Sequence, residues 1–255
     1  MNYNLHTHSF YCGHGSGLIS EYAAEAEKAG FFLLGFSEHC PFPDNFLSKS
    51  RMPFASASLY EQDVKALDCS FPVLLGYEVD YFRNRRSYYE EIHSRVDYLI
   101  TGTHYIFRKD GSVASVFDAD LTSSDLSLYA DSVIEAMSSG LFSFCAHPDV
   151  FLSARSFDKE AKAVSVAILE AAKELGMPLE LNGNGYMKGR GYPSRGFWEI
   201  AHDMGIPALL SSDAHRVKDL AAPFDFLHSF ADGLALDLLE PYMENGLSFR
   251  KAART

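Results

Sequence analysis

The chain has 255 residues, of which 47% are hydrophobic and 22% charged, which is ordinary for a globular protein and sufficient for a full core. The formal net charge of −12 excludes non-specific attraction to nucleic acid or to an anionic membrane, although a phosphate could still bind where cations gather. The four cysteines form no metal or disulfide motif, and neither a leader-like segment nor an apolar run of membrane-spanning length occurs, so we expect a cytoplasmic protein.

Seven short apolar runs, each too short to be a helix, recur along the chain and are predicted to be strands. They cover residues 3–8, 32–36, 72–76, 96–100, 141–145, 177–181 and 206–210. Segments of helical period separate them, at residues 20–29, 56–67, 87–94, 124–138, 158–175 and 192–204. Residues 105–120 are expected to form a surface loop or hairpin. One or two helices are expected in residues 217–245, with the last ten residues weakly held.

Strands that alternate with helices predict an α/β fold, with a parallel sheet that is either open or closed into a barrel. Polar residues favour the barrel, because a histidine or a carboxylate directly follows six of the seven runs. The carboxyl ends of all strands meet at one mouth in a barrel, whereas an open sheet builds its site at one switch point. No convincing eighth run follows His215, so we predict a (β/α)7 barrel that occupies residues 1–255 as a single domain.

Histidines and carboxylates near the ends of these runs are the candidate metal ligands. They are His6, His8, His14, His39, Glu78, His104, His147, Asp213 and His215. Imidazole nitrogens and carboxylate oxygens suit zinc, iron or manganese, and nine ligands are more than one ion can use. We therefore expect two or three ions that share ligands. Glu78 or Asp213 should form the bridge, because these two are the acidic members of the set.

Polynuclear centres of this kind favour hydrolysis of a phosphate ester, because they hold a hydroxide between the ions and neutralise charge on a phosphoryl group. The non-bridging phosphate oxygens still need cationic partners, and guanidinium groups match their geometry. Arg155 lies eight residues after His147, and Lys188 and Arg190 lie in the loop after Asn182. We expect these three cationic side chains to contact the phosphate of the substrate.

Seven short motifs together resemble those of the PHP family of phosphoesterases. In chain order they are His6-Thr7-His8, Ser37-Glu38-His39, Gly76-Tyr77-Glu78-Val79-Asp80, Gly102-Thr103-His104, Ala146-His147-Pro148-Asp149, Leu179-Glu180-Leu181-Asn182 and Ser212-Asp213-Ala214-His215. The match spans residues 3–215 in unbroken order, which makes it specific. Cys12-Gly13-His14-Gly15 and Tyr192-Pro193-Ser194 are similar to the histidinol-phosphate phosphatase branch. The resemblance implies a distorted seven-stranded barrel, the PHP fold, that holds three divalent ions.

The family pattern also implies how the ligands are shared. His6, His8, Glu78 and Asp213 would hold the first ion, Glu78, His104 and His147 the second, and His14, His39 and His215 the third. All nine positions are filled by competent residues, and the ions would be Zn, Fe or Mn. Catalytic roles are expected for Glu78, Asp213 and His215. Residues 216–255 match the closing segment of the family poorly.

The resemblance implies a phosphomonoesterase that hydrolyses L-histidinol phosphate to L-histidinol and phosphate in histidine biosynthesis, by attack of a metal-bridging hydroxide. The partner would then be a small phosphate ester, not a nucleic acid polymer or a membrane. The amine and imidazole of that substrate suit an acidic mouth, for which Asp80, Asp118 and Asp149 are candidates. Two alternatives remain open. One is a phosphodiesterase or exonuclease acting on small nucleotides, and the other is a degenerate module that binds metal without catalysis.

Overall fold

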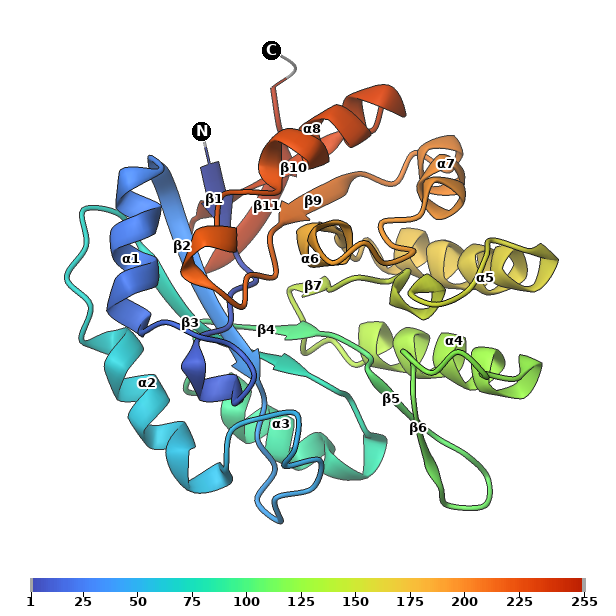
Figure 1. Cartoon of the computed structure of the whole chain (residues 1–255), viewed down its shortest axis with the longest axis horizontal. Coiled ribbons are helices and arrows are strands. Elements are labelled where there is room, and N and C mark those ends of the chain that lie inside the picture. Colours follow the sequence, from blue (N-terminus) through green and yellow to red (C-terminus); the bar gives the residue numbers. More distant parts are fainter. Residues whose placement is uncertain (1, 254–255) are drawn as a thin grey trace.

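A parallel sheet with helices along its outside organises the chain in a computed structural model that describes residues 2–253 (Figure 1). The strands of this sheet are, in spatial order, β1 (Asn2–Asn4), β2 (Phe31–His39), β3 (Val73–Val79), β4 (Tyr98–Thr101), β7 (Phe144–Cys145), β8 (Leu179–Asn182), β9 (Ala208–Ser211), β10 (Leu238–Met243) and β11 (Leu247–Lys251). Every neighbouring pair is parallel except β10 with β11. All seven predicted strands are present, so the α/β architecture is confirmed.

Helices fill the connections, as the helical periods predict. They are α1 (Ile19–Lys28), α2 (Ala57–Lys65), α3 (Arg86–His93), α4 (Ser123–Ser138), α5 (Lys159–Leu175), α6 (Gly183–Met187), α7 (Arg195–Asp203) and α8 (Phe224–Gly233). The capping of α5 explains its clear sequence signal. Its N-cap Asp158 accepts a hydrogen bond from the Ala161 backbone N–H, and Gly176 ends it at φ 63°, a left-handed conformation that glycine adopts without strain.

The hairpin expected in residues 105–120 is present as β5 (Tyr105–Phe107) and β6 (Val113–Ser115). The short helix α6 was not predicted. It follows β8 directly, because the Asn182 side chain accepts hydrogen bonds from the backbone N–H groups of Asn184 and Gly185. No helix among residues 2–253 is both long and apolar enough to cross a bilayer.

The sheet bends until its first strand meets its seventh, which gives a distorted barrel. Backbone pairing between the segments that follow these strands is a single bridge, Thr7 with Ala214, with a 2.9 Å hydrogen bond from the His8 backbone N–H to the Ala214 carbonyl. Towards the other end of the barrel, the Tyr3 hydroxyl donates to the Leu239 carbonyl and accepts from the Leu210 N–H, so it joins β1 to β9 and β10. β1 and β9 themselves form no strand pair among residues 2–253, so the barrel is not closed by a continuous ladder.

The prediction that no strand follows His215 is wrong, and so is the expectation that the last ten residues are weakly held. β10 continues the parallel sheet beyond β9, and β11 returns antiparallel beside it. Burial along β10 alternates between buried and partly exposed residues, and the strand contains Pro241. Because β10 is not buried on both faces, it has no continuous apolar run, which explains why the sequence pattern missed it. Residues 254–255 lie outside the described residues.

A separate apolar cluster fills the barrel interior beneath the carboxyl ends of the strands. Its buried members include Leu5, Leu33, Tyr98, Phe144 and Leu209. The Tyr98 ring fits because two neighbouring positions are glycine: a Cβ at Gly35 would lie 2.4 Å from the Tyr98 hydroxyl, and one at Gly76 would lie 2.5 Å from its ring. The Tyr98 hydroxyl donates to the Leu5 carbonyl at 2.8 Å. This packed floor fixes the segment that leads into His6.

Candidate metal centre

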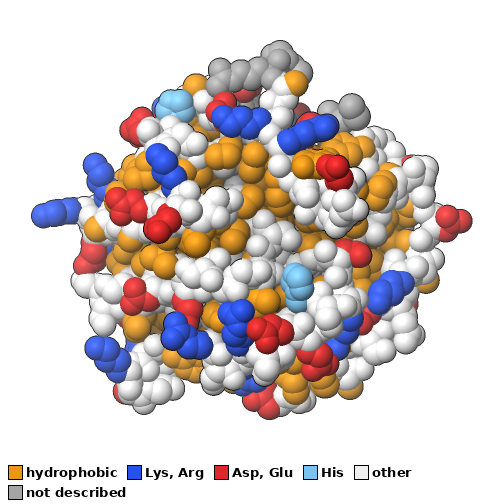
Figure 2. All heavy atoms as spheres, turned by 180° about the vertical axis from the view of Figure 1, so that it is seen from behind, with side chains coloured by type: hydrophobic (Ala, Val, Ile, Leu, Met, Phe, Trp, Pro, Cys, Tyr) orange, Lys and Arg blue, Asp and Glu red, His pale blue; other side chains and the backbone are white. Residues whose placement is uncertain are grey.

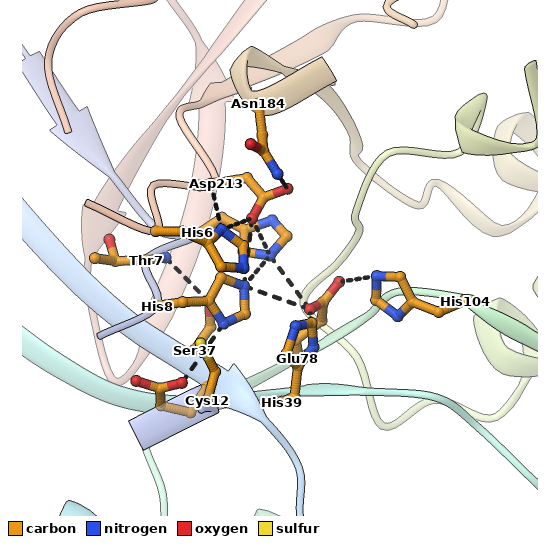
Figure 3. A network of polar contacts seen from close by, with 12 residues as sticks. His6, Thr7, His8, Cys12, Ser37, His39, Glu78, His104, Asn184 and Asp213 are labelled. Carbon is orange, nitrogen blue, oxygen red and sulfur yellow. Dashed lines mark hydrogen bonds and ion pairs between the residues drawn. The ribbon is translucent and has the colours of Figure 1, made fainter. Parts of the chain in front are cut away.

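The nine candidate ligands predicted from the sequence lie together at the carboxyl ends of the strands, where several of them point toward one another (Figure 3). His6 and His8 follow β1, and their Nε2 atoms are 3.0 Å apart. β2 ends with His39, and Glu78 lies next to the end of β3. His14 follows a 3₁₀ turn at Phe10–Cys12, and the remaining ligands lie in the loops after β4, β7 and β9. Segments far apart in sequence therefore supply one cluster.

Four of these residues form a first group, in which two imidazoles face the same two carboxylates. The Nε2 atom of His6 lies 3.5 Å from Glu78 Oε2 and 3.6 Å from Asp213 Oδ1. The Nε2 atom of His8 lies 3.5 Å and 3.4 Å from the same two oxygens. A tetrahedral ion with bonds of about 2.0–2.2 Å sets its ligand atoms about 3.3–3.6 Å apart. These four distances match that spacing, so both imidazoles lie where they could share a divalent ion with the carboxylates.

Glu78 faces a second group with its other oxygen. Its Oε1 atom lies 2.8 Å from His147 Nε2 and 3.4 Å from His104 Nε2. One carboxylate thus directs one oxygen to each of two groups of histidines, which is the arrangement of a bridging ligand. His147 adopts φ 30° and Asp213 adopts φ 50°. Strain of this kind in non-glycine residues persists where the surroundings impose it and is frequent at functional sites.

A third group lies beside the first two. His14 Nε2 and His215 Nε2 are 3.1 Å apart, and the His14 ring stacks on His39 at a centroid distance of 5.3 Å. Gly15 permits this approach, because a Cβ there would lie 2.5 Å from the Ser9 carbonyl oxygen. His39 also lies close to the first group, since its Nδ1 atom is 2.8 Å from Glu78 Oε2.

The electrostatics of the cluster fit bound cations. Burial raises the pKa of Glu78 and of Asp213, but neighbouring histidines outweigh it and hold both pKa values well below the ordinary carboxyl range. Glu78 Oε2 and Asp213 Oδ1 are nevertheless buried and accept no well-aligned hydrogen bond among residues 2–253, although His39 Nδ1 lies 2.8 Å from the Glu78 oxygen. An unsatisfied buried anion costs more than the roughly 1–3 kcal/mol of a neutral group. A cation between these oxygens would offset that cost, so the donor set fits divalent metal.

Two histidines of the third group are neutral. Burial, followed by the positive field of His8, holds the pKa of His39 and of His215 well below the ordinary histidine value. Neutral imidazole is the form that binds metal. The structure therefore presents both rings in the state that a ligand needs.

A cavity of about 160 Å³ opens beside the cluster. Its lining includes several of the candidate ligands together with three cations, Arg51, Lys188 and Arg190. The Arg190 guanidinium lies over the Phe117 ring, 4.4 Å from its centroid. Lys188 and Arg190 thus line the same cavity as several candidate ligands; their predicted contact with a phosphate stays a prediction.

The expectation for Arg155 is corrected. This residue is not part of the cavity lining; its Nη2 atom lies 2.8 Å from Asp158 and 3.4 Å from Glu160. Asp158 caps α5, so the carboxylates at the start of that helix hold the arginine away from the mouth.

None of the three predicted acidic residues supplies an acidic wall in this cavity. Asp80 is buried, and its carboxylate contacts Arg51 at 2.8 Å and His104 Nδ1 at 3.3 Å. Burial raises the pKa of Asp80, but these two partners bring it to about 2. Asp149 is buried where it accepts the Ser194 N–H, with its pKa raised by burial to about 7. Asp118 is exposed and accepts the Ser115 N–H.

Sequence reasoning missed three buried residues of the site: Glu38, Arg51 and Glu180. The Glu38 and Glu180 carboxylates lie behind His8 and His6, at 3.6 Å and 2.7 Å from their Nδ1 atoms. Both stand inside quoted motifs, so the signal was available but had no assigned role. Arg51 lies in a proline-rich loop without a motif.

Comparison with known proteins identifies relatives of the chain. The PHP domain matches residues 4–184. The probable histidinol-phosphatase of Deinococcus radiodurans is 29% identical over 232 residues, which cover 86% of this chain and 88% of that protein. The histidinol-phosphatase of Bacillus subtilis is 26% identical over 258 residues, which cover 86% and 96%.

Solved structures show the same fold. The HisK crystal structure from Listeria monocytogenes matches with a TM-score of 0.74 at 19% identity and covers 88% of this chain and 99% of that one. Histidinol phosphate phosphatase from Lactococcus lactis, complexed with Zn, L-histidinol and phosphate, matches with a TM-score of 0.66 at 14% identity and covers 96% and 98%.

Proposed function

The chain belongs to the PHP domain family, and on that basis we propose that it is a metal-dependent phosphomonoesterase that hydrolyses L-histidinol phosphate to L-histidinol and phosphate, a step of histidine biosynthesis. The names of its relatives support the substrate, as do the Zn, L-histidinol and phosphate bound by the Lactococcus lactis structure. The observation that carries the proposal is the position of Glu78, whose two oxygens face two separate histidine groups beside a cavity lined by cations.

The proposed centre contains three divalent ions of Zn, Fe or Mn type. His6, His8, Glu78 and Asp213 hold the first, Glu78, His104 and His147 the second, and His14, His39 and His215 the third. Bound divalent ions lower the pKa of water into the neutral range and neutralise charge that develops on a phosphoryl group.

The chain itself binds and orients the substrate. Lys188 and Arg190, which line the cavity together with several ligands, would neutralise the phosphate, and the Phe117 ring packs against the Arg190 guanidinium. Asp213 is fixed for its role, because its Oδ2 atom accepts hydrogen bonds from the side-chain amides of Asn182 and Asn184. Glu78, Asp213 and His215 are therefore the residues on which catalysis depends.

The size of the cavity and the charge of the chain favour a small monoester. A space of about 160 Å³ suits one phosphate with a short alcohol. The net charge of the chain is −12, and on the face seen in Figure 2 Lys and Arg side chains are interspersed with Asp and Glu. A nucleic acid polymer would gain little attraction from such a face.

The test is an assay of the metal-loaded protein on L-histidinol phosphate, beside a chromogenic phosphomonoester and a chromogenic phosphodiester. We expect the highest kcat/KM for L-histidinol phosphate and little turnover of the diester. Turnover of the chromogenic monoester without turnover of L-histidinol phosphate would refute the substrate. Preferential hydrolysis of the diester would favour the phosphodiesterase alternative, and bound metal without any turnover would favour the degenerate module.

A further inference from the structure

Strand β8 is the exception in the barrel. Each of the other strands from β1 to β9 in the main sheet ends at, or leads into, at least one of the nine candidate ligands. The residues at the end of β8 are Glu180 and Asn182, both fully buried and neither among those nine. A buried carboxylate needs a physical reason to be there, because burying its charge is costly unless it is paired.

Glu180 is paired with residues that follow β1 and β7 and with Asn182 of its own strand. Its Oε1 atom lies 2.7 Å from His6 Nδ1. Its Oε2 atom accepts the His147 backbone N–H at 2.8 Å and the Asn182 side-chain amide at 2.8 Å. Both oxygens are thus occupied by donors, and Glu180 does not line the cavity. It can neither reach the substrate nor offer a free oxygen to an ion.

These contacts act on the ligands of two groups at once. Because a carboxylate accepts hydrogen bonds, His6 Nδ1 is the donor, and His6 Nε2 is left free to face the first group. The bond to the His147 N–H holds a backbone that has φ 30°. Asn182 extends the same network, since its amide also lies 3.2 Å from Asp213 Oδ2.

We propose that Glu180 is a positioning residue that couples the first and second ion sites, by fixing His6 through its side chain and His147 through its backbone. The inference rests on the metal centre proposed above and deepens it. In this role β8 holds two ligands that follow other strands, His6 after β1 and His147 after β7. Removal of the Glu180 charge should therefore weaken metal binding at two positions together.

Glu38 offers a contrast within the same site. It is equally buried and also faces a ligand histidine, His8, but at 3.6 Å, and its Oε1 atom is used by the backbone and hydroxyl of Ser9. Glu38 therefore lies beside one ligand of the first group, without a hydrogen bond to it, and contacts no ligand of the second group in the described residues. Replacement of Glu38 should affect one position only.

The test measures metal binding, not turnover, in the full-length protein. Glu180→Gln keeps the side-chain volume but replaces one acceptor oxygen by an NH₂ group, which cannot accept the hydrogen bonds that His6, His147 and Asn182 donate. We expect two positions per chain to weaken by about 10–100-fold in titrations of the metal-free protein with Zn²⁺ or Co²⁺. Glu38→Gln should weaken one position. Asp125→Asn is the control, because Asp125 is a buried carboxylate that pairs with Arg108 and belongs to none of the proposed metal sites. This variant should bind metal at every site as the wild type does.

Wild-type stoichiometry and affinity in Glu180→Gln would overturn the inference, and so would weakening at one position only. If Glu180→Gln does not fold, the same metal titration is carried out on Glu180→Asp. This variant keeps the charge but is too short to reach both partners, so metal binding at two positions should again weaken, by a smaller factor, and unchanged binding would overturn the inference. Failure of the proposed function looks different, because the wild-type protein would then bind no metal or would bind it without hydrolysing L-histidinol phosphate.

Discussion

The two ends of the barrel differ in what their residues are arranged to do. At the carboxyl ends of the strands, charged and polar groups converge, buried oxygens lack donors, and His147 and Asp213 adopt positive φ. At the other end, β10 and β11 pack apolar residues against the barrel interior, and Phe249 and Leu247 cover its floor. The comparison indicates that the floor contributes stability, whereas the rim carries strain and unsatisfied charge that a ligand would relieve.

Metal removal should have the largest effect, and it should act on the rim. Dialysis against a chelator is expected to abolish phosphatase activity, and Zn²⁺, Mn²⁺ or Fe²⁺ should restore it. The metal-free protein should also melt at a lower temperature, because metal at 100 times its Kd stabilises the folded state by about 2.7 kcal/mol. Full activity at a metal content below one ion per chain would contradict the proposal.

Glu78→Gln should reduce kcat by about 10³-fold, because stabilisation by the ions is worth several kcal/mol and the bridge between them is lost. The free energy of unfolding of the metal-free protein should change little or rise, since a buried charge with an unpartnered oxygen is removed. His8→Ala is expected to behave similarly in activity. If the variant lost as much free energy of unfolding as it lost in transition-state stabilisation, the proposed difference between rim and floor would be contradicted.

Arg190→Ala should lower kcat/KM for the phosphate ester by roughly 10–100-fold, the worth of hydrogen bonds to a charged group. Metal content should be unchanged. Arg155→Ala is the matched control, because Arg155 pairs with Asp158 and Glu160 outside the cavity lining. Equal kinetics in the two variants would remove Arg190 from the site.

Tyr3→Phe tests the floor. It removes the hydroxyl that joins Leu210 and Leu239 and leaves a buried N–H and a buried carbonyl each without that partner. The free energy of unfolding should fall by about 1–3 kcal/mol in urea denaturation, with kcat/KM nearly unchanged. A comparable loss of kcat would show that the floor and the rim are not independent.

Asp125→Asn should have the smallest effect, and this effect depends on pH. Asp125 closes the capping box of α4 and pairs with Arg108, and hydrogen bonds from that guanidinium hold its pKa below the ordinary value. A lowered folded-state pKa contributes stability above the unfolded-state pKa, and this contribution is lost as pH falls toward the folded value. The variant should therefore lose about 1 kcal/mol at pH 7 and less near pH 3, as measured by thermal or denaturant unfolding at both pH values. A difference that stays constant with pH would exclude a role for the charge.

Much of the fold and the candidate site could be predicted from the chain in linear order. The rim was predictable because the carboxyl end of a parallel strand is a place that sequence can mark: an apolar run followed by a histidine or a carboxylate. His6, Glu78, His147 and Asp213 all carry that mark, and the structure brings them to one point. The seven runs and the long helix α5 were predictable for the same reason, since burial on both faces and helix capping each leave a local pattern.

What the sequence by itself determined was therefore which residues stand at the ends of which strands. Only the tertiary structure decided which other residues these side chains contact, because such contacts depend on packing between strands that are distant in sequence. Glu180 looks like one polar residue inside an apolar run until the fold brings His6 and the His147 backbone to its two oxygens. Arg155 looked like a phosphate ligand until the start of α5 supplied closer carboxylates. The strands β10 and β11 left no apolar run, since one face of each is partly exposed and their pairing alone defines them.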